Sequence, residues 1–91
     1  MPNVPTENSV EAWHRYFAVE FNNRGWDLSV KERDPGQDEE MLHAAHASTF
    51  HWAAIGTELN RMRASMLLAE VHALLGHGET ALAYASTMRD F

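Results

Sequence analysis

Apolar residues recur along the chain at helical spacing, in four stretches separated by short polar or glycine-containing breaks. Within each stretch they lie three, four or seven positions apart, as on one face of an α-helix. No stretch alternates with the two-residue period of a β-strand. The pattern predicts helices over residues 9–30, 35–55, 58–75 and from 79 onward. The expected fold is all-α, with the four helices forming two antiparallel hairpins or a four-helix bundle.

Capping residues mark where the predicted helices begin. Asn8 and Glu11 have the spacing of a capping box before the first helix. Asp34, Pro35 and Gln37 form the clearest start in the chain, because aspartate caps, proline fits the first helical position and glutamine can reach back.

Glycines mark where the second and third helices end. We expect Gly56 and Gly76 to take the left-handed conformation common just after a helix, and Thr57 to cap the third helix. Joints this short make the helices on either side antiparallel. The second helix is rich in alanine, which predicts close neighbours on more than one side.

The first predicted helix is apolar over more of its surface than one narrow face requires. Gly25 is costly inside a helix, by roughly 1 kcal/mol against alanine, so we expect a bend there or the close approach of another backbone. The large apolar residues of this helix are most simply core, but any left uncovered would form a binding or dimer surface. The surface predicted in this way consists of Trp13, Tyr16, Phe17 and Trp26.

Composition narrows the class of protein. The 91 residues are 45% hydrophobic and 22% charged, as in one small globular domain. Residues 1–7 are expected to be a flexible lead-in and residues 8–91 the domain. The last predicted helix reaches Phe91 without a cap, so we expect either a fragment of a longer protein or an end covered by a partner.

Charge and cysteine content exclude several functions and suggest a compartment. With 13 acidic against 7 basic residues and no basic cluster, binding to nucleic acid is not expected. The start of the chain does not read as a signal peptide, and no apolar run is long enough to cross a membrane. The chain has no cysteine, which fits a reducing cytoplasm, the expected location.

Residues 65–88 carry small and apolar residues at recognisable spacings. The matching positions are Leu68, Ala69, Gly76 and Ala81, and on them the stretch resembles one tetratricopeptide repeat. Ser65, His72 and Ala85 depart from that repeat, each replacing a large or aromatic residue. Such repeats form helical hairpins and bind protein partners in a groove, so the resemblance implies an interaction module.

A second resemblance involves the predicted second helix. The run at residues 40–46, followed by His51 and Trp52, is similar to uncharacterised bacterial helical proteins that are longer than this chain. That similarity implies a bacterial source and agrees with a fragment. It implies no activity.

Six histidines provide the candidate chemistry, because histidine is the commonest metal ligand. Glu-x-x-His, the spacing used in di-iron bundles, occurs at Glu11/His14 and at Glu40/His43. Antiparallel register separates these two motifs by roughly 16 Å, so one chain cannot use both for one metal. The same register places His14 opposite His51.

Register also brings four potential ligands to one height on three helices. They are Glu20, His43, His46 and Glu70. Two carboxylates and two imidazoles suit zinc, manganese or iron. The simpler interpretation is that Arg24 pairs with Glu20 and Arg63 with Glu70, while the histidines are structural. His72 and His77 are expected at the surface or in a turn.

No catalytic motif is present, neither a Gly-x-Ser-x-Gly elbow nor a glycine-rich phosphate loop. Nothing therefore identifies an enzyme, and no organic cofactor is expected. The sequence predicts a non-catalytic protein-interaction module, with a homodimer the expected assembly. The alternative is a helical bundle that binds a divalent metal. A third hypothesis is a small-ligand pocket lined by Trp13, Trp26, Trp52 and Met66.

Overall fold

The computed structural model describes residues 4–89 and forms them into four α-helices. Their bounds differ from the predicted ones by one residue at most, and the described residues contain no strand. The start of the expected lead-in, residues 1–3, and the expected uncapped helix end at Phe91 lie outside the described part of the chain. The helices are α1 (Val10–Ser29), α2 (Pro35–Ile55), α3 (Glu58–Leu74) and α4 (Gly78–Arg89).

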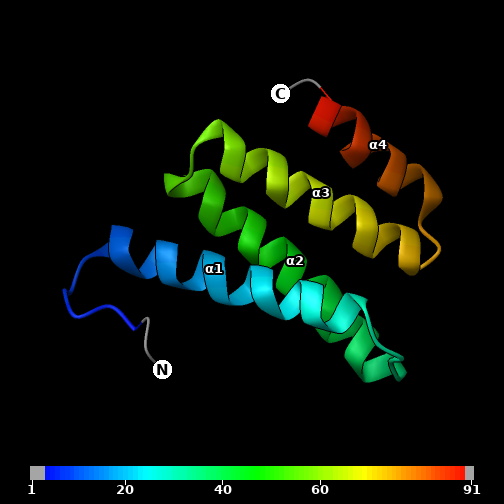
Figure 1. Ribbon diagram of the computed structural model, residues 1–91, viewed down its shortest axis with the longest axis horizontal. Coiled ribbons are helices and arrows are strands. Elements are labelled where there is room, and N and C mark those ends of the chain that lie inside the picture. The colour runs from blue at the N-terminus through cyan, green and yellow to red at the C-terminus, as the bar shows by residue number, and fades with distance from the viewer. Residues whose placement is uncertain (1–3, 90–91) are drawn as a thin grey trace.

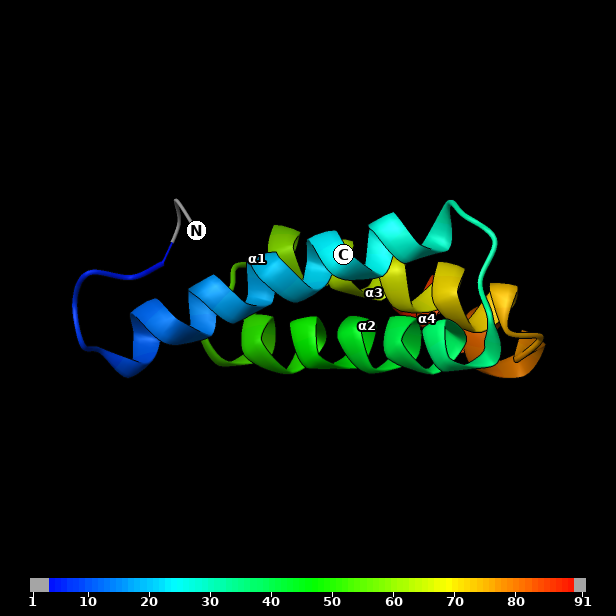
Figure 2. The same ribbon diagram turned by 90° about the horizontal axis from the view of Figure 1, so that it is seen from below.

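The helices pack as two antiparallel hairpins, which confirms the predicted fold class. α1 lies along α2 and α4 along α3, and α3 also contacts both helices of the first hairpin (Figure 1). Seen from the side, α1 lies above α2 (Figure 2). The molecule measures 40 × 33 × 15 Å, so most side chains are near a surface. None of the described helices is both long enough and apolar enough to span a bilayer.

Capping side chains fix the helix starts, with one correction to the prediction. Asp34 and Gln37 form the predicted capping box at the start of α2. At α1 the cap is Ser9 rather than Asn8, because Ser9 has the extended backbone of a cap and its hydroxyl accepts from the Ala12 amide at 3.1 Å. Thr57 caps α3 as predicted.

The two glycine joints differ in conformation. Gly76 has φ of 80° and therefore takes the predicted left-handed conformation. Gly56 does not, because its backbone is extended at φ −84° and ψ 165°. Glycine is needed there for space instead, since a Cβ would lie 2.6 Å from the carbonyl oxygen of Trp52.

The core lies where α3 meets both helices of the first hairpin. A Cβ on Gly25 of α1 would lie 3.0 Å from Cδ2 of Leu67. The predicted close approach at Gly25 is therefore made by a side chain of α3, not by another backbone. The fully buried cluster consists of Leu28, Met41, Ala45, Leu67, Leu68 and Val71.

Small residues let α1 and α2 approach each other. The buried Ser48 hydroxyl of α2 donates to the Ala18 carbonyl of α1 at 2.8 Å. Ala44 and Ala45 are buried as the alanine-rich pattern predicted. Residues 53 and 54 are exposed, so the expectation of neighbours on several sides fails for the end of α2, which no described helix covers on that side.

Replacing Leu67 with alanine tests this packing. The side chain is fully buried between the two hairpins, so Leu67→Ala should lower the free energy of unfolding by about 2–5 kcal/mol. Urea denaturation measures the change. The matched control is Leu82→Ala on α4, 65% exposed, which should change stability by less than about 0.5 kcal/mol. Equal effects of the two substitutions would contradict the described core.

Candidate functional site

Seven aromatic and imidazole rings from α1 and α2 form one continuous cluster, here called the aromatic face. Neighbouring ring centroids are 5.0–6.3 Å apart. The rings follow one another on α1 at helical spacing and meet a pair from the end of α2. They belong to Trp13, His14, Tyr16, Phe17, Phe21, Phe50 and His51.

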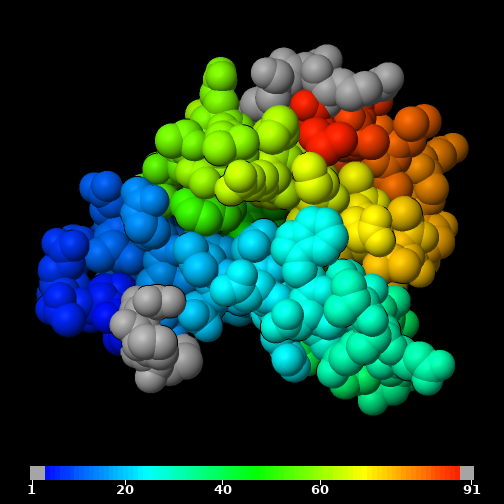
Figure 3. Space-filling view, viewed as in Figure 1, coloured from blue at the N-terminus to red at the C-terminus, as the bar shows by residue number. Residues whose placement is uncertain are grey.

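Two of the seven rings of this face are exposed and the other five are half-buried. Phe50 is 68% exposed, Phe17 36%, and the adjoining Val10 75%. The space-filling view shows the residues before α1 and the start of α1, in blue, at one edge of the molecule (Figure 3). A depression of about 480 Å³ lies on the face, and its lining is Asn8, Ser9, Val10, Trp13, His14, Phe17 and His51.

A histidine pair lies at the centre of the aromatic face. The Nδ1 atoms of His14 and His51 are 2.8 Å apart, which confirms the pairing expected from register. At this separation one ring donates its proton to the other. Burial, and then the nearby charge that His14 would carry, lower the pKa of His51.

Three further histidines form a row between α2, α3 and the α3–α4 turn. His46 Nε2 lies 3.0 Å from His72 Nε2, and His72 Nδ1 lies 2.9 Å from His77 Nδ1. Burial is the first cause that lowers the pKa of both His46 and His72. The prediction that His72 lies at the surface or in a turn is wrong, because its side chain is only 7% exposed.

Simple hairpin register does not reveal this row. Around a turn centred between residues 56 and 57, His46 would lie opposite residue 67, five positions before His72. The row forms because the imidazole side chains extend across this offset. The only available signal was the number of histidines in the chain, six in 91 residues.

The predicted interaction residues are partly brought together. Trp13, Tyr16 and Phe17 are neighbours on the aromatic face. Trp26 packs against the core cluster instead. It lies more than two turns beyond Phe17 along α1, in the part of the first hairpin that α3 covers. For the predicted ligand pocket, Trp13 lines the depression, whereas Trp52 and Met66 do not.

The four predicted metal ligands have separate surroundings. His43 is exposed and lies 3.5 Å from Glu39, whereas His46 contacts His72. Glu70 is exposed on α3. Among the described residues, no group of three or more His, Asp or Glu side chains is placed to hold a metal ion. The expected ion pair between Glu20 and Arg24 is not the one found, because Arg24 pairs with Glu40.

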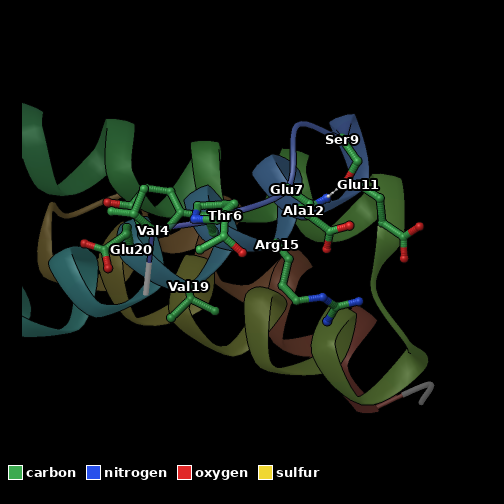
Figure 4. A pocket seen from close by; sticks show the side chains of 11 residues that line it. Val4, Thr6, Glu7, Ser9, Glu11, Ala12, Arg15, Val19 and Glu20 are labelled. Carbon is green, nitrogen blue, oxygen red and sulfur yellow. Dashed lines mark hydrogen bonds between the residues drawn. The ribbon is translucent and has the colours of Figure 1, made fainter. Parts of the chain in front are cut away.

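Glu20 lines a second cleft, of about 600 Å³, between the lead-in and α1. Figure 4 shows Glu20 and Val4 at one end of this cleft and Arg15 and Glu11 towards the other. Its lining combines carboxylates, a guanidinium and apolar groups. This mixture of charge indicates no single class of ligand.

Comparison of the chain with protein families, with curated proteins and with solved structures finds no match.

The depressed pKa of His51 predicts that acid destabilises the fold. Below the ordinary histidine pKa of about 6.5, the unfolded chain binds a proton at this position that the folded chain resists. Stability is therefore fully present above that pH and falls as the pH decreases towards the folded-state pKa. His51→Phe keeps an aromatic ring but removes the group that titrates. Below pH 6.5 its free energy of unfolding should therefore fall less steeply with decreasing pH, by a slope that corresponds to at most one bound proton. Urea denaturation at a series of pH values measures this slope, and parallel curves would contradict the prediction.

Proposed function

We propose that the protein is a non-catalytic helical interaction module that works as a homodimer, with the aromatic faces of two copies in contact. The observation that carries this proposal is the size and exposure of the aromatic face. Single exposed apolar residues are ordinary, but a contiguous exposed patch on a soluble domain commonly marks a binding surface. Here seven rings adjoin one another, and Phe50 at the edge is 68% exposed.

The residue types of the face favour a protein partner. Aromatic side chains bring a large contact area at little cost in side-chain entropy, and they dominate the residues that contribute most to binding energy. Interface centres are also poor in charged residues. The lining of the depression on the aromatic face contains no acidic residue, lysine or arginine.

A second copy fits this face for reasons of charge and shape. Each chain has a formal net charge of −6, so copies repel unless they meet through an uncharged surface. The face also combines an exposed ring, that of Phe50, with a depression. Phe50 stands beside the depression, next to His14 and His51, which line it. A two-fold axis pairs the same patch on both copies, so each Phe50 can enter the depression of the other.

The helical framework suits this role. α3 packs against both helices of the preceding hairpin, and successive hairpins stacked in this way are used by helical-repeat proteins that bind partners on extended surfaces. This arrangement supports the tetratricopeptide-like interpretation. The support comes from the packing of the helices. The sequence adds less, since residues 65–88 carry only part of the repeat pattern.

The alternative function, a metal-binding bundle built on Glu20, His43, His46 and Glu70, has less support. A bundle site needs inward-facing ligands from several helices that converge on one point. Glu20 lines the cleft beside the lead-in, and His43 and Glu70 are exposed. The four side chains would therefore have to move to reach one ion, whereas the rings of the aromatic face already adjoin one another. The interaction module is for this reason the better supported function.

An aspartate at the edge of the aromatic face should break the dimer. Phe50→Asp places a charge in the depression of the other copy, while changing a side chain that is mostly exposed in the monomer. Sedimentation equilibrium should give the wild type twice its monomer mass of 10.3 kDa. The variant should dimerise at least tenfold more weakly, with an unchanged circular dichroism spectrum.

Leu82→Asp is the matched control, because Leu82 is similarly exposed at 65% but lies on α4. It should leave dimerisation unchanged. If the wild type is a monomer at high micromolar concentration, the homodimer is excluded. If both variants weaken it equally, the contact between copies is not specific to the aromatic face.

A further inference from the structure

The row of three histidines connects three separate segments of the chain, away from the aromatic face. His46 is on α2, His72 is on α3 and His77 is in the turn that leads to α4. Tyr84 of α4 covers the row, with its ring stacked on His72 at a centroid distance of 5.6 Å and an angle of 20°. The same ring meets the His46 imidazole edge to face at 6.3 Å.

The tautomers available to His72 determine what the row can bind. Both of its ring nitrogens face another histidine. If His72 donates its Nδ1 proton to Nδ1 of His77, its Nε2 carries a lone pair directed towards His46. The neutral His46 ring can also present a lone pair at Nε2. The two Nε2 atoms then form a pair of nitrogen donors that face one point.

We propose that His46 and His72 form a two-histidine binding site for a divalent transition metal ion such as Zn²⁺, with His77 as a positioning residue. Metal-bound histidines almost always donate their second ring proton to another group, which fixes the tautomer and the ring orientation. His77 is placed to accept that proton from His72. The site shares only His46 with the ligand set predicted from the sequence.

The separation of the two donors fits a chelated ion. With metal–nitrogen bonds of about 2.0–2.1 Å and tetrahedral angles, two ligating nitrogens lie about 3.3 Å apart. The two Nε2 atoms are 3.0 Å apart, so the rings need to separate by about 0.3 Å and to turn until both lone pairs point at an ion beside the line between them. His46 is exposed and can make this adjustment, while the buried His72 stays fixed between Tyr84 and His77.

The site selects by ligand type and leaves the ion accessible. Imidazole nitrogens suit zinc, nickel and copper, whereas magnesium and calcium prefer oxygen ligands. The described residues offer two nitrogen donors here and no third ligand group, so water completes the coordination. The bound ion would connect α2 to α3 and face solvent on the His46 side.

Zn²⁺ titration of the full chain by isothermal calorimetry at pH 7.5, after treatment with a chelator, tests the site. Wild type should show saturable Zn²⁺ binding and no response to Mg²⁺. His46→Gln should weaken Zn²⁺ binding at least tenfold, and the circular dichroism spectrum of the metal-free variant checks that the fold is kept. His77→Gln should weaken it about 10- to 100-fold, as expected for the loss of a group that orients a ligand.

His14→Gln is the matched control, since it disrupts the other histidine pair and leaves the row intact. Cu²⁺ supplies a second readout, because electron paramagnetic resonance should detect coupling to two imidazole nitrogens in wild type and to fewer in His46→Gln. Absence of saturable Zn²⁺ binding overturns the proposal. So does binding that His46→Gln leaves unchanged or that only His14→Gln removes.

Discussion

Leu67 of α3 packs into the space beside Gly25 of α1, and this contact holds the two hairpins together. Each hairpin can form through its own short turn, but joining them requires α3 to lie close to α1. A side chain at position 25 would press on Leu67, since a Cβ there would be 3.0 Å from Cδ2. The glycine, costly in an isolated helix, is thus compensated by a fully buried leucine.

This contact explains why α1 has two different halves. Its C-terminal half lies under α3 and contributes the buried Leu28 to the core. Its N-terminal half packs along the end of α2 and borders the lead-in, so the rings of the aromatic face are only partly covered. In a molecule only 15 Å thick, an aromatic residue outside the region where three helices meet has no further layer to cover it.

The histidines follow the same geometry. Where two helices run side by side, His14 and His51 form a simple pair within the aromatic face. Where α2, α3 and the final turn converge, His46, His72 and His77 form a row. The two groups therefore suit different roles: His51, with its lowered pKa, lies within the proposed contact surface, and the row holds the two nitrogen donors of the proposed metal site. Both depend on where the third helix begins to cover the first hairpin.

The sequence by itself determined the four helices, the capping residues of α2 and α3 and the antiparallel hairpins, because these depend on residues at most a few positions apart. It also placed His14 opposite His51, since register counted from a short turn holds within one hairpin. Only the tertiary structure decided that Trp26 is covered while Phe17 and Phe50 are exposed, and that His72 is buried beside His46. Those outcomes depend on how one hairpin is offset against the other, and that offset is set by side-chain packing at Gly25 and Leu67, which no local pattern encodes.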